Sequence, residues 1–335
     1  MRIGLIGLGR IGAFHADTLA ALDRVDELVV TDPVAAAVDA VTTRIRKATA
    51  VGSPEAVLDA GVDGVVIAAT TGAHAELLLA SAGRGIPTFC EKPIASTAAE
   101  SARVAEVILK SGVPVQVGYQ RRFDAAFAAA KRAVDDGSLG ILHTVRSTTM
   151  DPAPPPMDYI KGSGGIFRDC AVHDFDVLNW ITGQRAVEVY ATGTVQGDPL
   201  FADYQDVDTA AVIVKFDGGA LGVVSNARYN ARGYDCRLEV HGFDDSVAAG
   251  WDQGVPLRNT DPANDFPTGP AHHFFMDRFT EAFRTELAAF VRVTQGEAIP
   301  GATVADAVEV AWLAEAATES LRRGAPVTIA EVREA

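Results

Sequence analysis

The pattern of hydrophobic and polar positions divides the chain into two regions. Over the first 120 residues, short apolar runs rich in β-branched residues alternate with helical patterns. The expected strands are Arg2–Ile6, Leu28–Thr31, Gly64–Ala69, Pro87–Cys90 and Pro114–Gly118. The expected helices are Ala13–Leu22, Pro54–Asp59, Ala73–Arg84 and Thr97–Ser111. Strands that alternate with helices predict a parallel, doubly wound sheet.

After Tyr119 the pattern changes to longer strands with an apolar residue at every second position. A helix (Asp124–Asp136) and a strand (His143–Thr149) precede a proline-rich loop, DPAPPPMDYIKGSGG, in which we expect no regular structure. Four strands follow, with a hairpin signal at Asp217-Gly218-Gly219 between the second and third: Ala186–Val195, Thr209–Phe216, Ala220–Arg228 and Tyr234–His241. Helices His273–Thr294 and Thr303–Arg323 and a strand Pro326–Ile329 end the chain. The second region is therefore expected to be an α/β domain with a mostly antiparallel open sheet.

Length and composition fit an ordinary globular protein. A chain of 335 residues predicts two domains, which we place at residues 1–120 and 121–335. A net charge of −15 argues against a nucleic-acid partner. The three cysteines show neither disulfide nor metal-ligand spacing, and no metal is expected. No apolar run is long enough to span a membrane and no secretory cleavage region is seen, so we expect a cytoplasmic protein.

Apolar positions in the expected second sheet also predict association between copies of the chain. Val212, Val214 and Phe216 are interpreted as an exposed apolar face. On this basis we expect a homo-oligomer, a tetramer or a dimer.

A glycine-rich turn follows the first strand and opens the first helix. Its sequence, Gly7-Leu8-Gly9-Arg10-Ile11-Gly12, has the G-x-G-x-x-G spacing of the Rossmann fold. The first glycine makes the turn, the second lets the backbone approach a pyrophosphate, and the third lets the helix pack closely on the strand. The amides at the helix N-terminus then face the anion. This motif predicts a dinucleotide site.

Asp32 ends the second strand, 20 residues after Gly12. A carboxylate at this spacing takes the ribose hydroxyls and repels a 2′-phosphate, which favours NAD over NADP. The alternative is that Asp32 only starts the turn before Pro33.

Three further motifs together carry a family resemblance. They are Glu91-Lys92-Pro93 after the strand 87–90, the segment from Gly118 to Asp124 (GYQRRFD), and the segment from Gly164 to Asp176 (GGIFRDCAVHDFD). In this order they resemble the glucose-fructose oxidoreductase, inositol dehydrogenase and rhizopine-catabolism (Gfo/Idh/MocA) family, most closely its inositol 2-dehydrogenase branch. The resemblance covers essentially the whole chain.

The resemblance implies an NAD-dependent dehydrogenase that oxidises a secondary alcohol. By analogy His173 accepts the hydroxyl proton, Lys92 polarises the reacting oxygen, and Asp169 binds a neighbouring hydroxyl and orients the base. His173 and Asp169 are four residues apart. If residues 168–181 form one helix, the two side chains share a face and can hydrogen-bond each other.

Other residues complete the expected site. We expect Thr70, His74 and Glu91, with Lys92, to contact the cofactor. Arg122, Asp176 and Tyr234 are expected near the substrate; the alternatives are an interdomain salt bridge, a helix-surface charge and a core tyrosine, respectively. Phe283 and Met150 stand where inositol dehydrogenases often carry a tyrosine and a basic residue.

The expected substrate is myo-inositol or a related cyclitol, and the reaction a CH–OH oxidation. A pyranose dehydrogenase or a keto-sugar reductase would use the same residues. A non-catalytic NAD-bound sensor on the same fold is the alternative from another class. The presence of Lys92, Asp169 and His173 favours the enzyme.

Overall fold

A computed structural model describes residues 1–334, which pack into two compact units. The first unit comprises Met1–Phe123 and Glu281–Glu309, and the second comprises Asp124–Thr280 and the residues from Val310 onwards. The first division of the chain thus falls three residues after the expected one. The segment Glu281–Glu309, which we had grouped with the second domain, packs with the first unit.

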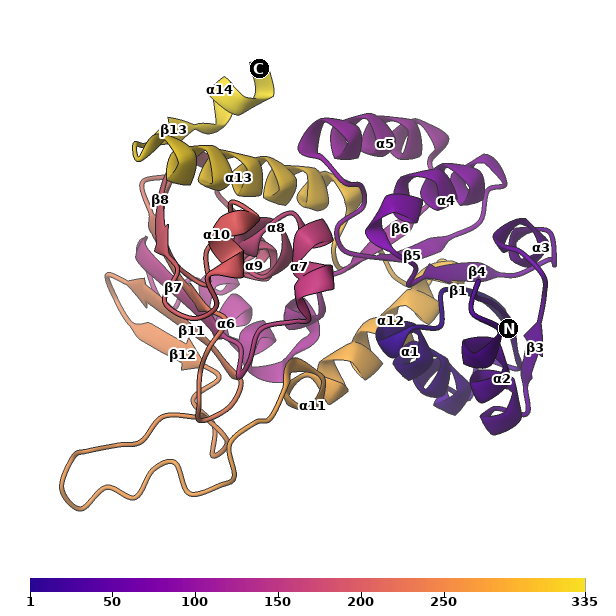
Figure 1. Ribbon diagram of the computed structural model, residues 1–335, viewed down its shortest axis with the longest axis horizontal. Coiled ribbons are helices and arrows are strands. Elements are labelled where there is room, and N and C mark those ends of the chain that lie inside the picture. The colour runs from indigo at the N-terminus through magenta and orange to yellow at the C-terminus, as the bar shows by residue number, and fades with distance from the viewer. Residues whose placement is uncertain (335) are drawn as a thin grey trace. The chain divides into compact units, whose positions relative to one another are not determined.

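The first unit contains a six-stranded parallel sheet of order β3-β2-β1-β4-β5-β6 (Figure 1). Its strands are β1 (Arg2–Ile6), β2 (Glu27–Thr31), β3 (Ala48–Ala50), β4 (Gly64–Ile67), β5 (Thr88–Glu91) and β6 (Val115–Gly118). The inner strands are continuous apolar runs because both faces of a parallel sheet are covered; Val65, Val66 and Ile67 have no exposed surface. This confirms the predicted doubly wound sheet, to which the structure adds β3.

Helices cover the two faces of this sheet, with α4 and α5 on one side and α1 and α12 on the other (Figure 1). The helices up to residue 123 are α1 (Arg10–Ala21), α2 (Ala35–Arg44), α3 (Pro54–Leu58), α4 (Thr71–Gly83), α5 (Ala98–Ser111) and the 3₁₀ helix η1 (Gln120–Phe123). Sequence analysis missed α2, which buries only Val41 along its length and therefore has a weak apolar stripe.

Helix α12 (Thr280–Thr294) belongs to the first unit from Glu281 onwards because of its apolar face. Leu287, Phe290 and Val291 are buried in the same core as the strands of the parallel sheet. The ring centroids of Phe290 and Phe89 are 5.9 Å apart. At Gly64 the helix comes so close that a Cβ would lie 2.5 Å from the Thr294 side chain. A late segment of the chain is thus part of the first core.

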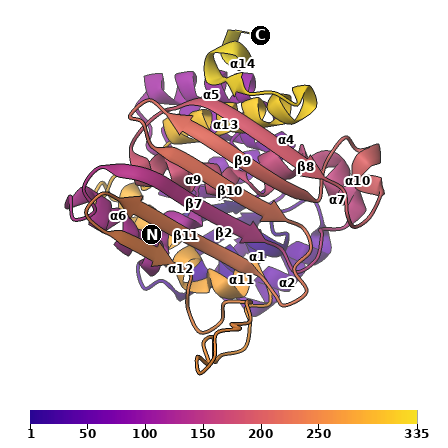
Figure 2. The same ribbon diagram turned by 90° about the vertical axis from the view of Figure 1, so that its left-hand side faces the viewer.

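The second unit is built on a seven-stranded sheet of order β12-β11-β7-β10-β9-β8-β13 (Figure 2). Its strands are β7 (Leu142–Met150), β8 (Ala186–Thr194), β9 (Thr209–Phe216), β10 (Leu221–Ala227), β11 (Asp235–Gly242), β12 (Ser246–Ala249) and β13 (Val327–Thr328). All neighbours are antiparallel except β7 and β10, which are parallel. The mostly antiparallel sheet and the β9–β10 hairpin were both predicted.

The second unit contains both short and long helices. Its helices are α6 (Ala125–Asp135), α7 (Met157–Ser163), α8 (Ile166–Asp169), α9 (Val172–Thr182), α10 (Leu200–Asp203), α11 (Phe275–Arg278), α13 (Val304–Arg323, which begins in the first unit) and α14 (Ile329–Glu334).

Two expectations about these helices were wrong. The proline-rich loop contains α7, because Pro156 serves as its N-cap and leaves the helix interior free of proline. The expected helix His273–Thr294 is two helices, α11 and α12.

One face of this sheet is packed by α9, and the other is open (Figure 2). Along β9 exposed and buried residues alternate strictly. Val212, Val214 and Phe216 are buried, so our interpretation of them as an exposed face was wrong. The exposed face of β9 is formed by the residues that alternate with them. The outward positions include Ile213 of β9, Tyr190 of β8 and Leu221 of β10, which are exposed.

No helix within residues 1–334 combines the length and the apolar character needed to cross a membrane. Across the same residues, no group of three or more His, Cys, Asp or Glu side chains is arranged to hold a metal ion.

Candidate active site

The glycine-rich turn joins β1 to α1 at the middle of the parallel sheet. Gly7 has φ of +94°, and a Cβ there would lie 2.5 Å from the backbone oxygen of Ala68. A Cβ at Gly12 would lie 1.9 Å from the backbone oxygen of Gly7. Both positions therefore require glycine, one for the turn and the other for close packing of helix on strand.

Gly9 differs from the other two because a Cβ there would meet no atom within 4 Å. Its φ and ψ (−63° and −166°) are open to any residue, so the fold itself does not require glycine. Gly9 is also the N-cap of α1, and no side chain caps this helix end. Open space beside uncapped amides is what a dinucleotide pyrophosphate needs, so the residues present fit NAD at this turn.

Asp32 follows β2 and supports the same turn. Its Oδ2 accepts a hydrogen bond from the Leu8 amide at 2.6 Å, and its Oδ1 accepts one from the Val34 amide at 2.8 Å. The expected alternative, a role in the local turn, is therefore real. Each carboxylate oxygen accepts more than one hydrogen bond, so this role is compatible with binding of ribose hydroxyls.

Glu91 and Lys92 lie at the carboxyl end of β5. The Oε1 of Glu91 lies 2.7 Å from Nε2 of His15, a fully buried residue of α1. On the other side, a Cβ at Gly118 of β6 would come within 2.9 Å of the Glu91 carboxylate. Glu91 is thus fixed between α1 and β6. This fixes the backbone position of the next residue, Lys92, which is half-buried.

His15 was missed by sequence reasoning. It contacts the rings of Phe14, Phe89 and Phe283 edge-on, with centroids between 5.7 and 6.2 Å away. Phe283, where inositol dehydrogenases often carry a tyrosine, is 3% exposed. The only sequence signal for His15 was its place in the first turns of a helix that follows the glycine motif.

Two other expected cofactor residues lie at the start of α4, which follows β4. Thr70 is the exposed N-cap of α4, and its hydroxyl makes no capping bond. His74 is buried, with Nδ1 at 2.7 Å from the Pro93 oxygen and Nε2 at 3.0 Å from the Ala69 oxygen. These contacts tie the β4–α4 turn to the Lys92-Pro93 turn. Contact of either residue with the cofactor stays a prediction.

Asp169 and His173 do not share one helix, contrary to our expectation. Helix α8 ends at Asp169 and α9 begins at Val172. The amide of Ala171 donates to the Ile166 oxygen, five residues back, which breaks the helical register between them. The single continuous helix that we expected is therefore interrupted, and a hydrogen bond between Asp169 and His173 stays a prediction.

The carboxylate of Asp169 is held from two sides. Its Oδ1 accepts a hydrogen bond from the hydroxyl of Tyr159 in α7 at 2.8 Å. Its Oδ2 accepts one from Arg228, which follows β10, at 2.9 Å. With 12% of its side chain exposed, Asp169 remains reachable from solvent. Neither Tyr159 nor Arg228 was identified from the sequence, because each is more than nine residues from Asp169 along the chain.

Asp174 and Asp176 of α9 are both buried. Asp174 accepts hydrogen bonds from Ser147, Thr149 and Asn226, at 2.5 to 2.9 Å, and so fixes α9 to β7 and β10. Asp176 is 1% exposed, which rules out the helix-surface charge that was its alternative. It lies three residues after His173, on the same side of α9.

Arg122, expected near the substrate, is held within the first unit. Its Nη1 donates to the Gly301 oxygen at 3.1 Å and lies 3.4 Å from the Asp306 carboxylate. The side chain is 7% exposed. These contacts support a structural role, and substrate contact by Arg122 stays a prediction.

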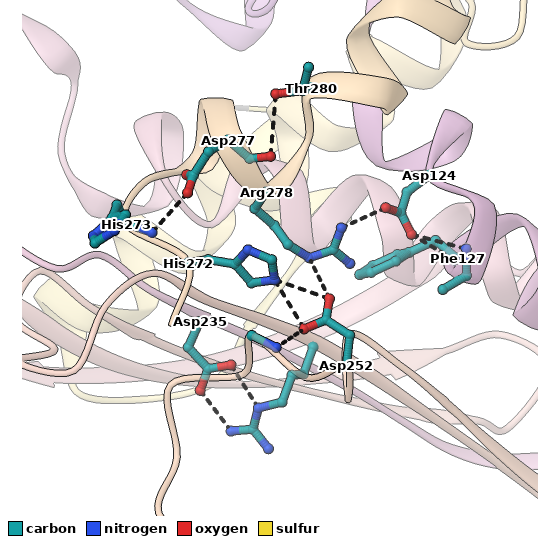
Figure 3. Close-up of polar contacts among 12 residues, drawn as sticks. Asp124, Phe127, Asp235, Asp252, His272, His273, Asp277, Arg278 and Thr280 are labelled. Carbon is teal, nitrogen blue, oxygen red and sulfur yellow. Dashed lines mark hydrogen bonds and ion pairs between the residues drawn. The ribbon is translucent and has the colours of Figure 1, made fainter. Parts of the chain in front are cut away.

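Tyr234 is 3% exposed and packs edge-on against Phe279. Phe279 follows Arg278, whose Nη1 donates to Asp124, the N-cap of α6, at 2.7 Å. Asp252 faces Arg278 and accepts a hydrogen bond from His272 at 3.0 Å (Figure 3). This network fixes the segment against which Tyr234 packs.

Two of the buried cysteines, Cys90 and Cys170, are unsuited to nucleophilic chemistry. Burial raises the pKa of the Cys90 thiol well above its usual value, and Glu91 raises it further. Burial likewise raises the pKa of Cys170, with Asp151 adding to it. A thiol that stays protonated is a poor nucleophile.

A doubly wound sheet whose first turn offers uncapped amides and open space defines a dinucleotide-binding α/β protein. Residues 1–119 match the oxidoreductase family with an NAD-binding Rossmann fold, and residues 127–248 match the GFO/IDH/MocA C-terminal domain. The chain belongs to the Gfo/Idh/MocA oxidoreductase family, which confirms the predicted resemblance.

Similar proteins include two bacterial enzymes. The chain is 36% identical to myo-inositol 2-dehydrogenase of Thermotoga maritima, with 99% of each chain covered. It is also 36% identical to inositol 2-dehydrogenase of Rhizobium meliloti, with 98% of this chain and 99% of the relative covered. The crystal structure of scyllo-inositol dehydrogenase from Lactobacillus casei with bound NAD(H) and scyllo-inositol aligns with a TM-score of 0.89 at 26% identity, covering 98% of this chain and 99% of that one.

Proposed function

We propose that this protein is an NAD-dependent dehydrogenase that oxidises a secondary alcohol of a cyclic polyol, myo-inositol or a related inositol. The observation that carries the proposal is the glycine turn. Gly7 and Gly12 are required by packing, whereas Gly9 borders open space and uncapped amides. The similar proteins support the substrate class, because two are named inositol 2-dehydrogenases and a third is a scyllo-inositol dehydrogenase with bound scyllo-inositol.

The proposed chemistry divides among three side chains. Bound NAD supplies the hydride acceptor. His173 accepts the proton of the substrate hydroxyl, and the Lys92 ammonium stabilises negative charge that develops on the same oxygen. Asp169 accepts a hydrogen bond from a neighbouring hydroxyl and so fixes the orientation of the ring.

The cofactor preference follows from Asp32. Its carboxylate, already anchored by the Leu8 and Val34 amides, accepts hydrogen bonds from ribose hydroxyls and repels a 2′-phosphate. We therefore propose NAD rather than NADP as the cofactor.

A pyranose dehydrogenase or keto-sugar reductase is the second candidate, because Lys92, Asp169 and His173 would run the same chemistry on those substrates. Met150 does not decide between the candidates. It lies at the end of β7, and because Ser147 and Thr149 point to α9, strand alternation directs Met150 to the opposite face of the sheet.

We also propose that the protein is a cytoplasmic homo-oligomer, a tetramer or a dimer, formed through the open face of the second sheet. Tyr190, Ile213 and Leu221 supply apolar surface there, and Lys215 pairs with Glu188 on the same face. Multi-angle light scattering at micromolar concentration measures the number of chains. An Ile213→Glu variant is expected to dissociate, and a monomeric wild type would contradict the proposal.

Absorbance at 340 nm tests the function directly. The purified protein is incubated with NAD or NADP and a panel of inositols, hexoses and sugar acids at alkaline pH. Reduction of NAD with an inositol is the expected result, and reduction with a pyranose alone would favour the second candidate. Bound NAD without any reduction would overturn the enzyme proposal in favour of a sensor.

A further inference from the structure

Arg228 stands where two strands of the second sheet end side by side. The parallel strands β7 and β10 pair up to Met150 and Ala227, so Asp151 and Arg228 are the next residues of adjacent strand ends. Their backbones are fixed there: the Asp151 amide donates to the Ala227 oxygen at 2.8 Å, and the Arg228 amide donates to the Asp208 oxygen at 2.7 Å. The place of Arg228 is thus set by the sheet itself.

The guanidinium of Arg228 is 2% exposed and bridges two carboxylates. Its Nη2 donates to Oδ2 of Asp169 at 2.9 Å, and its Nη1 donates to Oδ2 of Asp151 at 3.3 Å. A buried arginine with fixed donor geometry holds a carboxylate in one orientation. Arg228 therefore orients Asp169 from the buried side.

Acidic groups outnumber the cation in this cluster. Besides Asp151 and Asp169, the charges acting on Arg228 include Asp206, whose Oδ1 accepts the Ile166 amide at 2.8 Å. Burial by itself would lower the pKa of Arg228, but Cys170, Asp169 and Asp151 outweigh burial and raise it. Burial raises the pKa of Asp206. The guanidinium thus compensates several negative groups at once.

The second anchor of Asp169 is different in kind. Tyr159, half exposed in α7, donates a neutral hydroxyl to Oδ1. One oxygen of Asp169 is therefore held by a buried positive charge, and the other by an exposed hydroxyl. A hydroxyl at this oxygen shows that it accepts the kind of group a polyol presents.

We propose that Arg228 is a positioning residue, which keeps the carboxylate of Asp169 ionised and aimed so that it can accept a hydroxyl of the substrate. The proposal rests on the proposed function, in which Asp169 binds the polyol. Arg228 acts through Asp169 and does not itself touch the reacting atoms. Without it, Asp169 would share a buried site with Asp151 and Asp206 and would take up a proton more easily.

The test compares pH profiles of kcat/KM for the oxidised polyol. For Arg228→Gln we expect kcat/KM at pH 7 to fall by about 100-fold and the acidic limb to move up by about one pH unit. Arg228→Lys keeps the charge and should restore most of the limb position, with only partial recovery of rate. The KM for NAD should stay within about twofold in both, because the glycine turn is untouched.

Two control variants separate positioning from general loss of structure. Arg237→Lys disturbs another two-point Arg–Asp pair in the same unit, with Asp235, and should lower thermal stability without moving the acidic limb. Tyr159→Phe removes the neutral anchor of Asp169 and should change KM for the polyol more than the limb. The proposal would be overturned if the acidic limb of the Arg228→Gln profile lay at the same pH as that of the wild type while kcat/KM fell equally at every pH.

A double-mutant cycle gives a readout independent of turnover. If Arg228 holds Asp169, the loss of unfolding temperature in Arg228→Gln/Asp169→Asn is smaller than the sum of the two single losses, each roughly 5–10 °C. Additive losses would overturn the pairing and the proposal with it. If the wild type reduced NAD with none of the tested polyols, the proposed function would be overturned. The double-mutant cycle would still decide whether Arg228 holds Asp169.

Discussion

The two units use different means to prepare a binding surface. In the first unit, the surface is the glycine turn of six consecutive residues. It is formed by the backbone conformation and by the absence of side chains at the glycines. In the second, Asp151, Asp169 and Arg228 come together from strand ends and a short helix up to 77 residues apart. A site made of local backbone leaves a motif in the sequence, whereas a site made of distant side chains leaves isolated residues.

The largest effect is expected at Lys92, the side chain that we propose the first unit contributes to the chemistry. Lys92→Ala should lower kcat by about 1,000-fold or more, because a positive charge at a developing alkoxide is lost. NAD affinity, measured by fluorescence titration, should stay within about threefold because the glycine turn is intact. Retained turnover would remove Lys92 from the reaction and leave the first unit with a purely backbone role.

Gly9→Ala and Gly12→Ala are a matched pair that tests the backbone role. The added methyl at Gly12 would meet the Gly7 oxygen at 1.9 Å, so unfolding should occur several degrees lower. At Gly9 the methyl enters open space. The unfolding temperature without cofactor should therefore hold, while NAD affinity falls about tenfold or more. Equal NAD affinity in Gly9→Ala and the wild type would place the pyrophosphate elsewhere.

Asp32 tests a side chain inside the backbone-dominated unit. Asp32→Ala should raise KM for NAD about tenfold and KM for NADP much less, because both a ribose acceptor and a repulsive charge are removed. Asp32→Asn removes the charge but keeps one side-chain oxygen, which can accept from either the Leu8 or the Val34 amide, and serves as a partial control for the local turn. An equal rise for both cofactors would assign Asp32 to the turn alone.

The smallest effect is expected at Asp206, in the side-chain cluster of the second unit. Burial raises its pKa in the folded protein, so the folded state binds a proton more tightly than the unfolded state. Its favourable contribution to stability is complete at low pH and is lost as pH rises through the folded-state pKa. Asp206→Asn should therefore gain a few degrees of unfolding temperature over the wild type between pH 4 and pH 7. A difference that does not change with pH would contradict the raised pKa.

Much of the fold was predictable because local patterns determine it. The apolar runs of the parallel sheet, the alternation in β9 and the glycine spacing each depend on neighbours in the sequence. The face of β9 was nevertheless assigned wrongly, since alternation gives the period and not which set of residues packs on α9. Helix α2, with one buried residue, leaves almost no signal.

The candidate site was predictable only residue by residue. Lys92, Asp169 and His173 were named from motifs, but no residue type predicts the interruption between α8 and α9, where the Ala171 amide donates to the oxygen five residues back. The partners of Asp169 and of Glu91, namely Arg228, Tyr159 and His15, were missed for the same reason. Their contacts depend on strand order and register, which pair residues far apart in the chain.

The return of Glu281–Glu309 to the first unit has a consequence for modularity. The chain passes between the two units after Phe123, after Thr280 and after Glu309. A gene fragment that stops at residue 120 would encode the six parallel strands without Leu287 and Phe290, so the face of the sheet around Phe89 would be left in water. Residues 1–120 are therefore not a module that recombination could transfer intact, because the core of the first unit also requires Glu281–Glu309.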